Sequence, residues 1–340
     1  MVVVAACGSV HNSDPAAGGD AGIGSPSPDA APAADAAVAS ELASCAQLAK
    51  TCGSATNDSC CDSPLVTGGS FARSYDDAND ASSGTTSFPA TVGTFRLDKY
   101  EITVGRFRAF VAAGLGTQAS PPADKAGTHA SIPGSGWDPN WDTNLVASTP
   151  ALIAAVACDP MFQTWTDTAG ANETKPMNCL SWYEAAAFCA WDGGYLPTEA
   201  EWNYAAAGGD QQRPYPWSIP SSSLAITADD ASYNNGTDCV GDGLPGCALS
   251  DLLAVGTTLM GNGRWGQEDL AGNVLEWVLD WAAAYAATCD DCANLTPAAH
   301  REVRGGSYDS STGNLRTGFR LNFVPTDRSS LIGARCARAP

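Results

Sequence analysis

Thirteen cysteines in 340 residues are the feature that most restricts how this chain can fold. Cytosolic thiols are kept reduced, so this cysteine content predicts an oxidising compartment and disulfide bonds. Long segments without clear periodicity, such as 114–150 and 210–268, need fasteners of this kind. If Cys7 has a separate role, twelve cysteines remain, which is enough for six disulfides.

The spacing of the cysteines predicts some pairings and leaves others open. Cys239 and Cys247 flank a Gly-Asp-Gly-Leu-Pro-Gly turn and are expected to close that loop. Cys289 and Cys292 have the C-x-x-C spacing of zinc and thiol redox sites, but the aspartates between them disfavour a thiolate and no second pair supports zinc, so we expect a disulfide. The segment 45–63 is expected to form two disulfides of open connectivity from Cys45, Cys52, Cys60 and Cys61. The remaining cysteines are separated in sequence and suited to tying a domain together: Cys158, Cys179, Cys189 and Cys336.

The beginning of the chain resembles a bacterial lipoprotein signal. Residues 4–7 read Val-Ala-Ala-Cys, similar to the lipobox whose cysteine is lipidated, although residues 1–7 are short for a signal peptide and lack a basic region. Residues 8–44 are mostly Ala, Gly, Ser, Pro and Asp without Lys or Arg, which predicts a disordered linker. We therefore expect a signal remnant at 1–7, a lipid anchor in the outer membrane at Cys7, and a place in the cell envelope, periplasmic or on the outer surface.

Charge and histidine content exclude several classes of function. A net charge of −20 argues against nucleic acid and anionic membrane surfaces as partners, because both require clusters of Lys and Arg. The three histidines, His11, His129 and His300, lie in no motif. The sequence therefore gives little support to non-haem iron, to histidine-bound copper or to a Ser-His-Asp hydrolase.

Two capping boxes are the clearest signals of helices. Ser181 precedes Glu184 by three residues and Thr198 precedes Glu201 by three, and each box opens a segment that a Gly-Gly pair ends. Thr103 is expected to cap a third helix, from Val104 to about Ala112. Short strands are expected at 66–71, 94–100, 303–308, 317–322 and 333–338.

The segment 269–281 concentrates three carboxylates, a Gly-Asn pair and two tryptophans. Gly272 and Asn273 tolerate positive φ, so a turn is favoured here over a continuous helix. A turn can gather carboxylate and carbonyl oxygens around Ca²⁺, which takes six to eight oxygen ligands. The alternative is a turn with a satisfied Asx hydrogen bond, followed by a core-facing apolar run.

Several separated motifs occur in an order that resembles the formylglycine-generating enzyme family, also called the sulfatase-modifying factor family. The motifs are 95–104, 177–185, 188–191, 195–205, 215–217, 269–277, 304–308 and 333–336. The resemblance covers 64–340 and implies an α+β fold, a C-type-lectin-like variant that is loop-rich, with short helices and short twisted strands. The family enzymes use two cysteines and a copper ion to oxidise a sulfatase cysteine to formylglycine, and they bind structural Ca²⁺.

The resemblance also implies roles for individual residues. One calcium site would use Asp269, Glu276 and the backbone carbonyls of Gly272 and Val274, and Glu101 matches another reported ligand position. A second family calcium site falls at about 230–252, where an insertion prevents its ligands from being assigned. Cys189 and Cys336 match a family disulfide.

The sequence departs from the family enzymes at their reactive centre. Ser310 and Leu315 stand where the enzymes have their two cysteines, and neither side chain offers a thiolate for copper. We expect no copper and no iron, and a non-catalytic binding or scaffold module for a protein, peptide or glycan ligand. The alternative is an oxidoreductase or maturation factor of the same family that acts on a protein or peptide substrate.

The candidate ligand-binding surface surrounds the positions of the lost cysteines. It comprises Ser307, Tyr308, Asp309, Ser310, Asn314, Arg316 and Arg320. The alternative for the two arginines is pairing with some of the many carboxylates of this chain, and the alternative for Tyr308, Trp217 and Trp277 is packing in the core.

Overall fold

The structure is a computed structural model that describes residues 42–340. The predicted signal remnant, the predicted lipidation of Cys7 and most of the predicted linker lie outside these residues. The predicted linker extends three residues too far, because residues 42–44 belong to the fold. Ala43–Cys45 form the short 3₁₀ helix η2, and the Ser44 side chain is buried.

A four-stranded sheet lies at the centre of the fold, in the order β8-β7-β5-β9. Its strands are β5 (Leu275–Trp281), β7 (Arg301–Arg304), β8 (Leu321–Phe323) and β9 (Ile332–Gly333). β7 runs antiparallel to β5 and β8, whereas β9 is parallel to β5. Every residue of β5 is buried, because elements cover both faces of the strand.

Two three-stranded sheets flank this centre. One has the order β1-β4-β10 and the other the order β2-β3-β6. Their strands are β1 (Leu65–Val66), β4 (Phe95–Leu97), β10 (Ala337–Arg338), β2 (Gly69–Ala72), β3 (Pro89–Val92) and β6 (Cys289–Asp290). The expected strand 66–71 is therefore two strands in different sheets. The predicted strand is interrupted at Gly68, where a Cβ atom would meet the Val92 carbonyl oxygen at 2.4 Å.

Two other strand predictions are wrong in part, and a third strand is shorter than predicted. The segment 333–338 is divided between β9 and β10, and 317–322 has a strand only from Leu321. The strand expected at 94–100 is present as the shorter β4. These errors share one cause, because pairing with distant segments decides where such short strands begin and end.

Four α-helices are present among residues 42–340: α1 (Val104–Ala112), α2 (Thr149–Val156), α3 (Trp182–Trp191) and α4 (Glu199–Ala206). Both predicted capping boxes are confirmed, as is the Thr103 cap, which accepts a hydrogen bond from the Arg106 N–H. The sequence did not predict α2. Within the same residues, five 3₁₀ helices cover Ala43–Cys45, Pro139–Asn144, Gly209–Gln211, Leu249–Asp251 and Thr312–Leu315.

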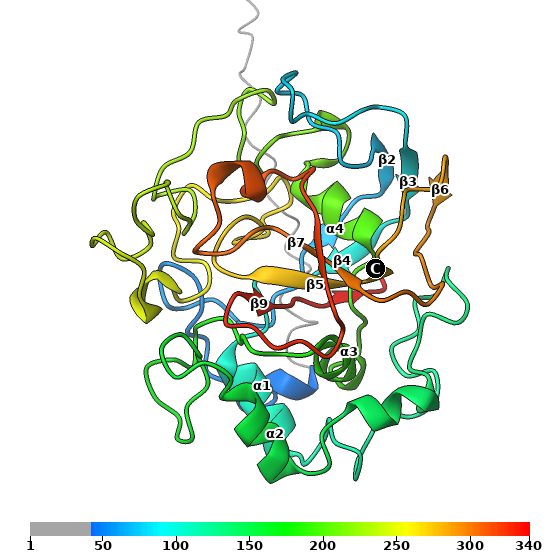
Figure 1. Ribbon diagram of the computed structural model, residues 1–340, viewed down its shortest axis with the longest axis vertical. Coiled ribbons are helices and arrows are strands. Elements are labelled where there is room, and N and C mark those ends of the chain that lie inside the picture. Colours follow the sequence, from blue (N-terminus) through cyan, green and yellow to red (C-terminus); the bar gives the residue numbers. More distant parts are fainter. Residues whose placement is uncertain (1–41) are drawn as a thin grey trace, which may run out of the picture. The chain divides into compact units, whose positions relative to one another are not determined.

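Helices α3 and α4 lie on either side of β5 (Figure 1). Each contributes a fully buried tryptophan whose indole N–H bonds to that strand: Trp182 to the Val278 carbonyl oxygen and Trp202 to the Glu276 carboxylate, both at 2.8 Å. Trp277 is also buried, as the core alternative predicted. Trp217 is only half-buried and stacks on Tyr215 at 5.1 Å.

Six disulfides link the twelve cysteines of residues 42–340. The predicted pairs Cys239–Cys247 and Cys289–Cys292 are confirmed, and so is Cys189–Cys336, which the family resemblance implied. The remaining pairs are Cys45–Cys61, Cys52–Cys60 and Cys158–Cys179. None of the helices in 42–340 has the length and apolar character needed to cross a membrane.

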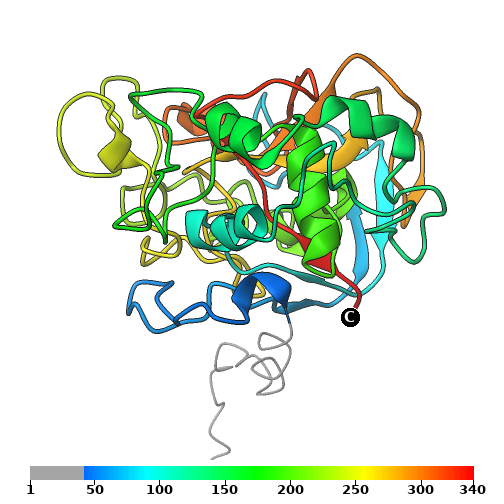
Figure 2. The ribbon, with the colours of Figure 1, turned by 90° about the horizontal axis from the view of Figure 1, so that it is seen from below.

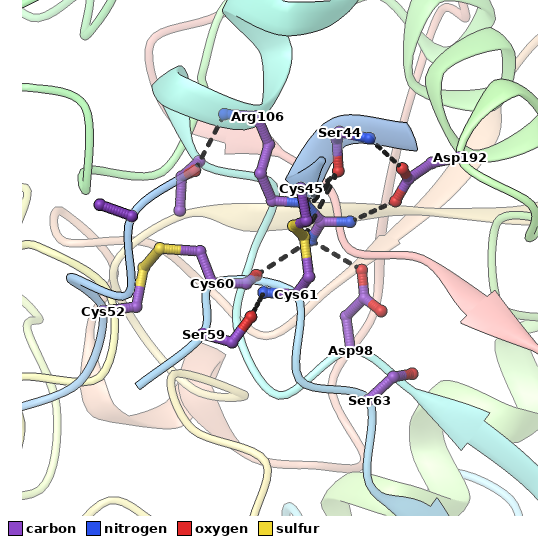
Figure 3. Close-up of a disulfide and its surroundings, with 12 residues drawn as sticks. Ser44, Cys45, Cys52, Ser59, Cys60, Cys61, Ser63, Asp98, Arg106 and Asp192 are labelled. Atoms are coloured by element: carbon purple, nitrogen blue, oxygen red, sulfur yellow. Dashed lines mark hydrogen bonds and ion pairs between the residues drawn. A yellow bond between two sulfur atoms is a disulfide. The ribbon is translucent and has the colours of Figure 1, made fainter. Parts of the chain in front are cut away.

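The cysteine-rich segment is attached to the domain through a buried group of ions. Helix η2 packs beside α1 (Figure 2), and the Cys45–Cys61 disulfide lies next to the side chain of Arg106 (Figure 3). The Arg106 guanidinium donates to Asp98 Oδ2 at 2.9 Å, to Asp192 Oδ2 at 2.6 Å and to Ser44 Oγ at 3.0 Å. Arg338 completes the group by pairing with the same two aspartates. Buried charges thus hold the segment to the domain, together with the apolar contacts that Cys52 and Cys60 make with Tyr100 and Val255.

Candidate functional site

The turn that precedes β5 has the conformation that its sequence predicts. Asp269, Gly272 and Asn273 have φ values of 57°, 88° and 58°. The Asn273 side chain does not make a local Asx bond. Its Oδ1 accepts from the Leu253 N–H at 3.0 Å, and its Nδ2 donates to Glu101 Oε2 at 3.2 Å. Asn273 therefore connects the turn to two segments that are distant in sequence.

Two carboxylates at this turn are buried, and neither forms a salt bridge within residues 42–340. Glu101 is fully buried, and its Oε1 has no hydrogen-bond partner within residues 42–340. Burial raises the pKa of Glu101 well above its usual range, and the negative charge of Asp269 raises it further. Burial also raises the pKa of Asp269, although Asp269 Oδ2 accepts from the Gly256 N–H at 2.6 Å. A cation placed against these oxygens would remove the energetic cost of ionising them.

Glu276, the third predicted carboxylate ligand, is held differently. Arg335 donates to both of its oxygens, at 2.8 and 2.9 Å, and the Trp202 indole N–H donates to Oε2 at 2.8 Å. A metal ion would have to share this carboxylate with a buried guanidinium. Glu101 and Asp269 are therefore the predicted carboxylate ligands that form no salt bridge within residues 42–340, whereas Glu276 acts first as the partner of Arg335.

The same turn fixes the segment that follows β7. The Gly272 N–H donates to the Gly305 carbonyl at 3.0 Å, and the Tyr308 N–H donates to the Asn273 carbonyl at 2.8 Å. Gly305 and Gly306 have φ values of 92° and 71°, so the strand expected at 303–308 ends at Arg304. The two glycines turn the chain toward the positions where the family enzymes carry their cysteines.

Ser310 and Leu315 lie in environments unlike a metal centre. The Ser310 hydroxyl accepts from the Ser307 N–H at 3.0 Å and contacts the Ser307 hydroxyl at 3.2 Å. Leu315 is fully buried in an apolar cluster with Tyr215 and Ala271. The hydroxyl thus closes a local turn, and the leucine fills space in the core.

The structure brings together only part of the predicted ligand-binding surface. Asp309 is exposed, Ser310 and Asn314 are half-buried, and Ser307 lies below them, almost fully buried. Tyr308 is 3% exposed and stacks on Phe162 at 5.8 Å, as the core alternative predicted.

The two predicted arginines do not line this surface. Arg316 is buried, and its guanidinium pairs with Asp76 and Asp80. Arg320 donates to Glu302 Oε1 at 2.9 Å and lies over the Tyr285 ring at 4.0 Å. Both arginines therefore pair with carboxylates, which was the alternative for them. The prediction that they belong to the ligand-binding surface was wrong. Their closeness to Ser310 in sequence is misleading because the 3₁₀ helix at Thr312–Leu315 redirects the chain.

Asp309 lies beside the inserted loop. Its Oδ1 accepts from Asn234 Nδ2 at 2.9 Å and lies 3.6 Å from Cys247 Sγ. Cys239, Cys247 and Asp309 together have the spacing of metal ligands. Because the two sulfurs form a disulfide, they offer no thiolate, and this group is not a metal site.

Sequence reasoning missed the buried arginines that organise these segments. Arg335 belongs to the motif 333–336 and uses its guanidinium for Glu276 and for the carbonyls of Asp98, Lys99 and Glu268. Arginine is seldom fully buried without a partner, so an arginine inside an apolar motif is a signal that could have indicated this role.

Comparisons with known proteins agree with this geometry. The family profile of the sulfatase-modifying factor enzyme 1-like domain matches residues 49–340. The formylglycine-generating enzyme of Streptomyces coelicolor is 30% identical over 269 residues, which cover 72% of this chain and 77% of that protein. The enzyme of Thermomonospora curvata is 29% identical over 274 residues and covers 72% and 82%.

Two further relatives extend the comparison. The inactive C-alpha-formylglycine-generating enzyme 2 of Bos taurus is 32% identical over 162 residues, which cover 48% of this chain and 50% of that protein. Among solved structures, PvdO from Pseudomonas aeruginosa superposes with a TM-score of 0.56 at 22% identity and covers 83% of this chain and 95% of that one. The fold prediction is therefore confirmed.

Proposed function

The chain belongs to the family of sulfatase-modifying factor enzyme 1-like domains, and from this premise we propose that it is a non-catalytic binding module of that family. The observation that carries the proposal is the pair of residues at the former reactive centre. Ser310 closes a turn with Ser307, and Leu315 is buried in the core, so neither could bind copper without rebuilding the segment. The similarity to an inactive member of the family supports the proposal.

The proposed ligand is a protein, a peptide or a glycan that contacts the surface of Asp309, Ser310 and Asn314. Two networks hold this surface in place, because the turn at Asn273 binds Tyr308 and because Asn234 donates to Asp309. A surface fixed in this way loses little conformational entropy when a partner binds. Rigidity without a reactive group is what a binding module requires.

Calcium is the proposed structural cofactor. Glu101 and Asp269 would hold it, together with the backbone carbonyls of Gly272 and Val274, while Glu276 remains shared with Arg335. Bound calcium supplies positive charge to carboxylates that are otherwise buried without enough of it. The unpartnered Oε1 of Glu101 is the observation that supports this assignment.

We expect the purified chain, loaded with Cu(I), to leave a Cys-x-Pro-x-Arg peptide unconverted in the presence of O₂, because it has no free thiol at Ser310 or Leu315. Mass spectrometry of the peptide detects formylglycine directly. An active formylglycine-generating enzyme in parallel controls for copper loading. Conversion above the background without protein, or one equivalent of tightly bound copper, would overturn the non-catalytic proposal.

A lipid anchor at Cys7 is proposed from the lipobox-like residues 4–7 and the composition of 8–44. In a diderm bacterial host that expresses the whole reading frame, the protein should sediment with the membrane fraction, because an acylated cysteine partitions into lipid. The Cys7→Ser protein should lose that sedimentation. A serine protein that remained with the membranes as the parent does would contradict the anchor.

A further inference from the structure

A cavity lies at the other end of β5 and β7 from Ser310. Glu276 pairs with Arg304 next to the Gly305–Gly306 turn, whereas Trp281 pairs with Arg301 at the opposite end, beside the cavity. The cavity has a volume of about 240 Å³, and its lining includes five charged side chains and a tyrosine: Arg73, Glu199, Asp280, Glu302, Arg320 and Tyr285. We propose that it binds a small zwitterion, a free α-amino acid.

Two buried polar atoms at the cavity lack partners. Arg73 is 5% exposed and Glu302 is 3% exposed, and neither Arg73 Nε nor Glu302 Oε2 has a hydrogen-bond partner within residues 42–340. The rest of each group is occupied. Arg73 Nη2 donates to the Ala286 carbonyl at 2.7 Å, and Glu302 Oε1 accepts from Arg320. Arg73 Nε and Glu302 Oε2 are therefore a buried donor and a buried acceptor on side chains of opposite charge that line the cavity, and the Ala283 N–H also faces the Glu302 carboxylate.

The charges around the cavity select the class of ligand. Glu199 pairs with Arg304 and Glu302 pairs with Arg320, which leaves Arg73 opposite Asp280, so the lining residues Arg73, Arg320, Asp280 and Glu302 carry two groups of each sign. This balance disfavours an inorganic anion or a metal ion, because either one would leave groups of its own sign without a partner. An α-amino acid satisfies both signs, with its carboxylate on Arg73 and its ammonium group on Glu302.

Tyr285 holds the two arginines in position. Its ring lies 4.5 Å from the Arg73 guanidinium and 4.0 Å from that of Arg320, and its hydroxyl contacts Glu199 at 2.6 Å. The site is therefore preorganised before a ligand arrives. Its volume is below the roughly 300–1,000 Å³ of pockets for drug-sized ligands, which suits a molecule the size of an amino acid. Exposed alanines at 283, 284 and 286 leave room for a side chain at the mouth.

Isothermal titration of the full chain with each common L-α-amino acid tests the site. We expect at least one amino acid to bind, and its N-acetyl amide, which has neither charge, to bind at least about tenfold more weakly. Glu302→Gln keeps the shape of the side chain, removes its charge and should weaken binding about tenfold to a hundredfold.

Two further variants distinguish a loss of binding from misfolding. Ala286→Phe fills the mouth from an exposed position and should abolish binding while leaving the melting temperature unchanged. Ala287→Phe, at an exposed neighbour outside the lining, should bind as the parent does. The proposal is overturned if no amino acid binds, if the N-acetyl amide binds equally well, if phosphate binds more tightly, or if binding survives Ala286→Phe.

Discussion

Replacing Arg106 by methionine is expected to lower the free energy of unfolding by about 3–5 kcal/mol, the largest effect we expect from a single substitution. The guanidinium is fully buried and reaches Asp98, Asp192 and Ser44. Methionine fills much of the same volume but leaves two buried aspartates with only Arg338 as a counterion. An uncompensated buried charge costs far more than a lost surface pair.

Arg108 provides a matched control on the same helix. It pairs with Glu173 at 2.7 Å, with both side chains about a quarter exposed, and lies over the Trp165 ring at 4.4 Å. Arg108→Met is expected to cost about 1 kcal/mol or less, since water screens such pairs. Urea unfolding of both variants with intact disulfides measures the difference. Equal losses would contradict the assigned role of the buried ion group.

Addition of Ca²⁺ to metal-free protein is expected to raise the free energy of unfolding by about 2.7 kcal/mol at one hundred times the dissociation constant. The proposed site binds the folded chain only, because the turn at Gly272–Asn273 brings its ligands together. The melting temperature in EGTA and in Ca²⁺ measures the gain. Mg²⁺ should substitute poorly, since it demands shorter and more regular coordination than a site of buried carboxylates and carbonyls offers.

Glu101→Gln separates a specific site from a general ionic effect. This variant should be more stable than the parent in EGTA, because it removes a carboxylate buried with an unpartnered oxygen, and it should gain little from Ca²⁺. Glu268→Gln is the control, because Glu268 pairs with Lys99 at 3.2 Å, and it should keep the full gain. A Glu101→Gln protein stabilised by Ca²⁺ as strongly as the parent would show that the ion binds elsewhere.

Local hydrogen bonding explains which parts of the fold the sequence could predict. The helices at Trp182–Trp191 and Glu199–Ala206 begin where a Ser or Thr and a Glu three residues later satisfy each other's backbone N–H groups. Such signals lie within one turn of chain. Cys239–Cys247 and Cys289–Cys292 were predictable for the same reason, because each pair closes a short loop.

Partners that are distant in sequence explain what could not be predicted. Gly68 breaks the expected strand because it packs against Val92, and Arg316 turns inward because Asp76 lies there. For the candidate site, the turn at Asn273 could be predicted, because Gly and Asn tolerate positive φ. The partners of Glu276 and Arg320 could not, since nothing near either residue in sequence indicates Arg335 or Tyr285.

The attachment of the cysteine-rich segment has a mechanical consequence. If the chain ahead of Cys45 is pulled, the force enters at η2. The Cys45–Cys61 disulfide offers it a covalent route to residue 61 that bypasses residues 46–60. Part of the force passes through Ser44 to Arg106 and Asp192, which are braced by Arg338 on the last strand. Extension of the chain from this end would therefore have to disrupt buried ion pairs as well as the pairing of β1 with β4.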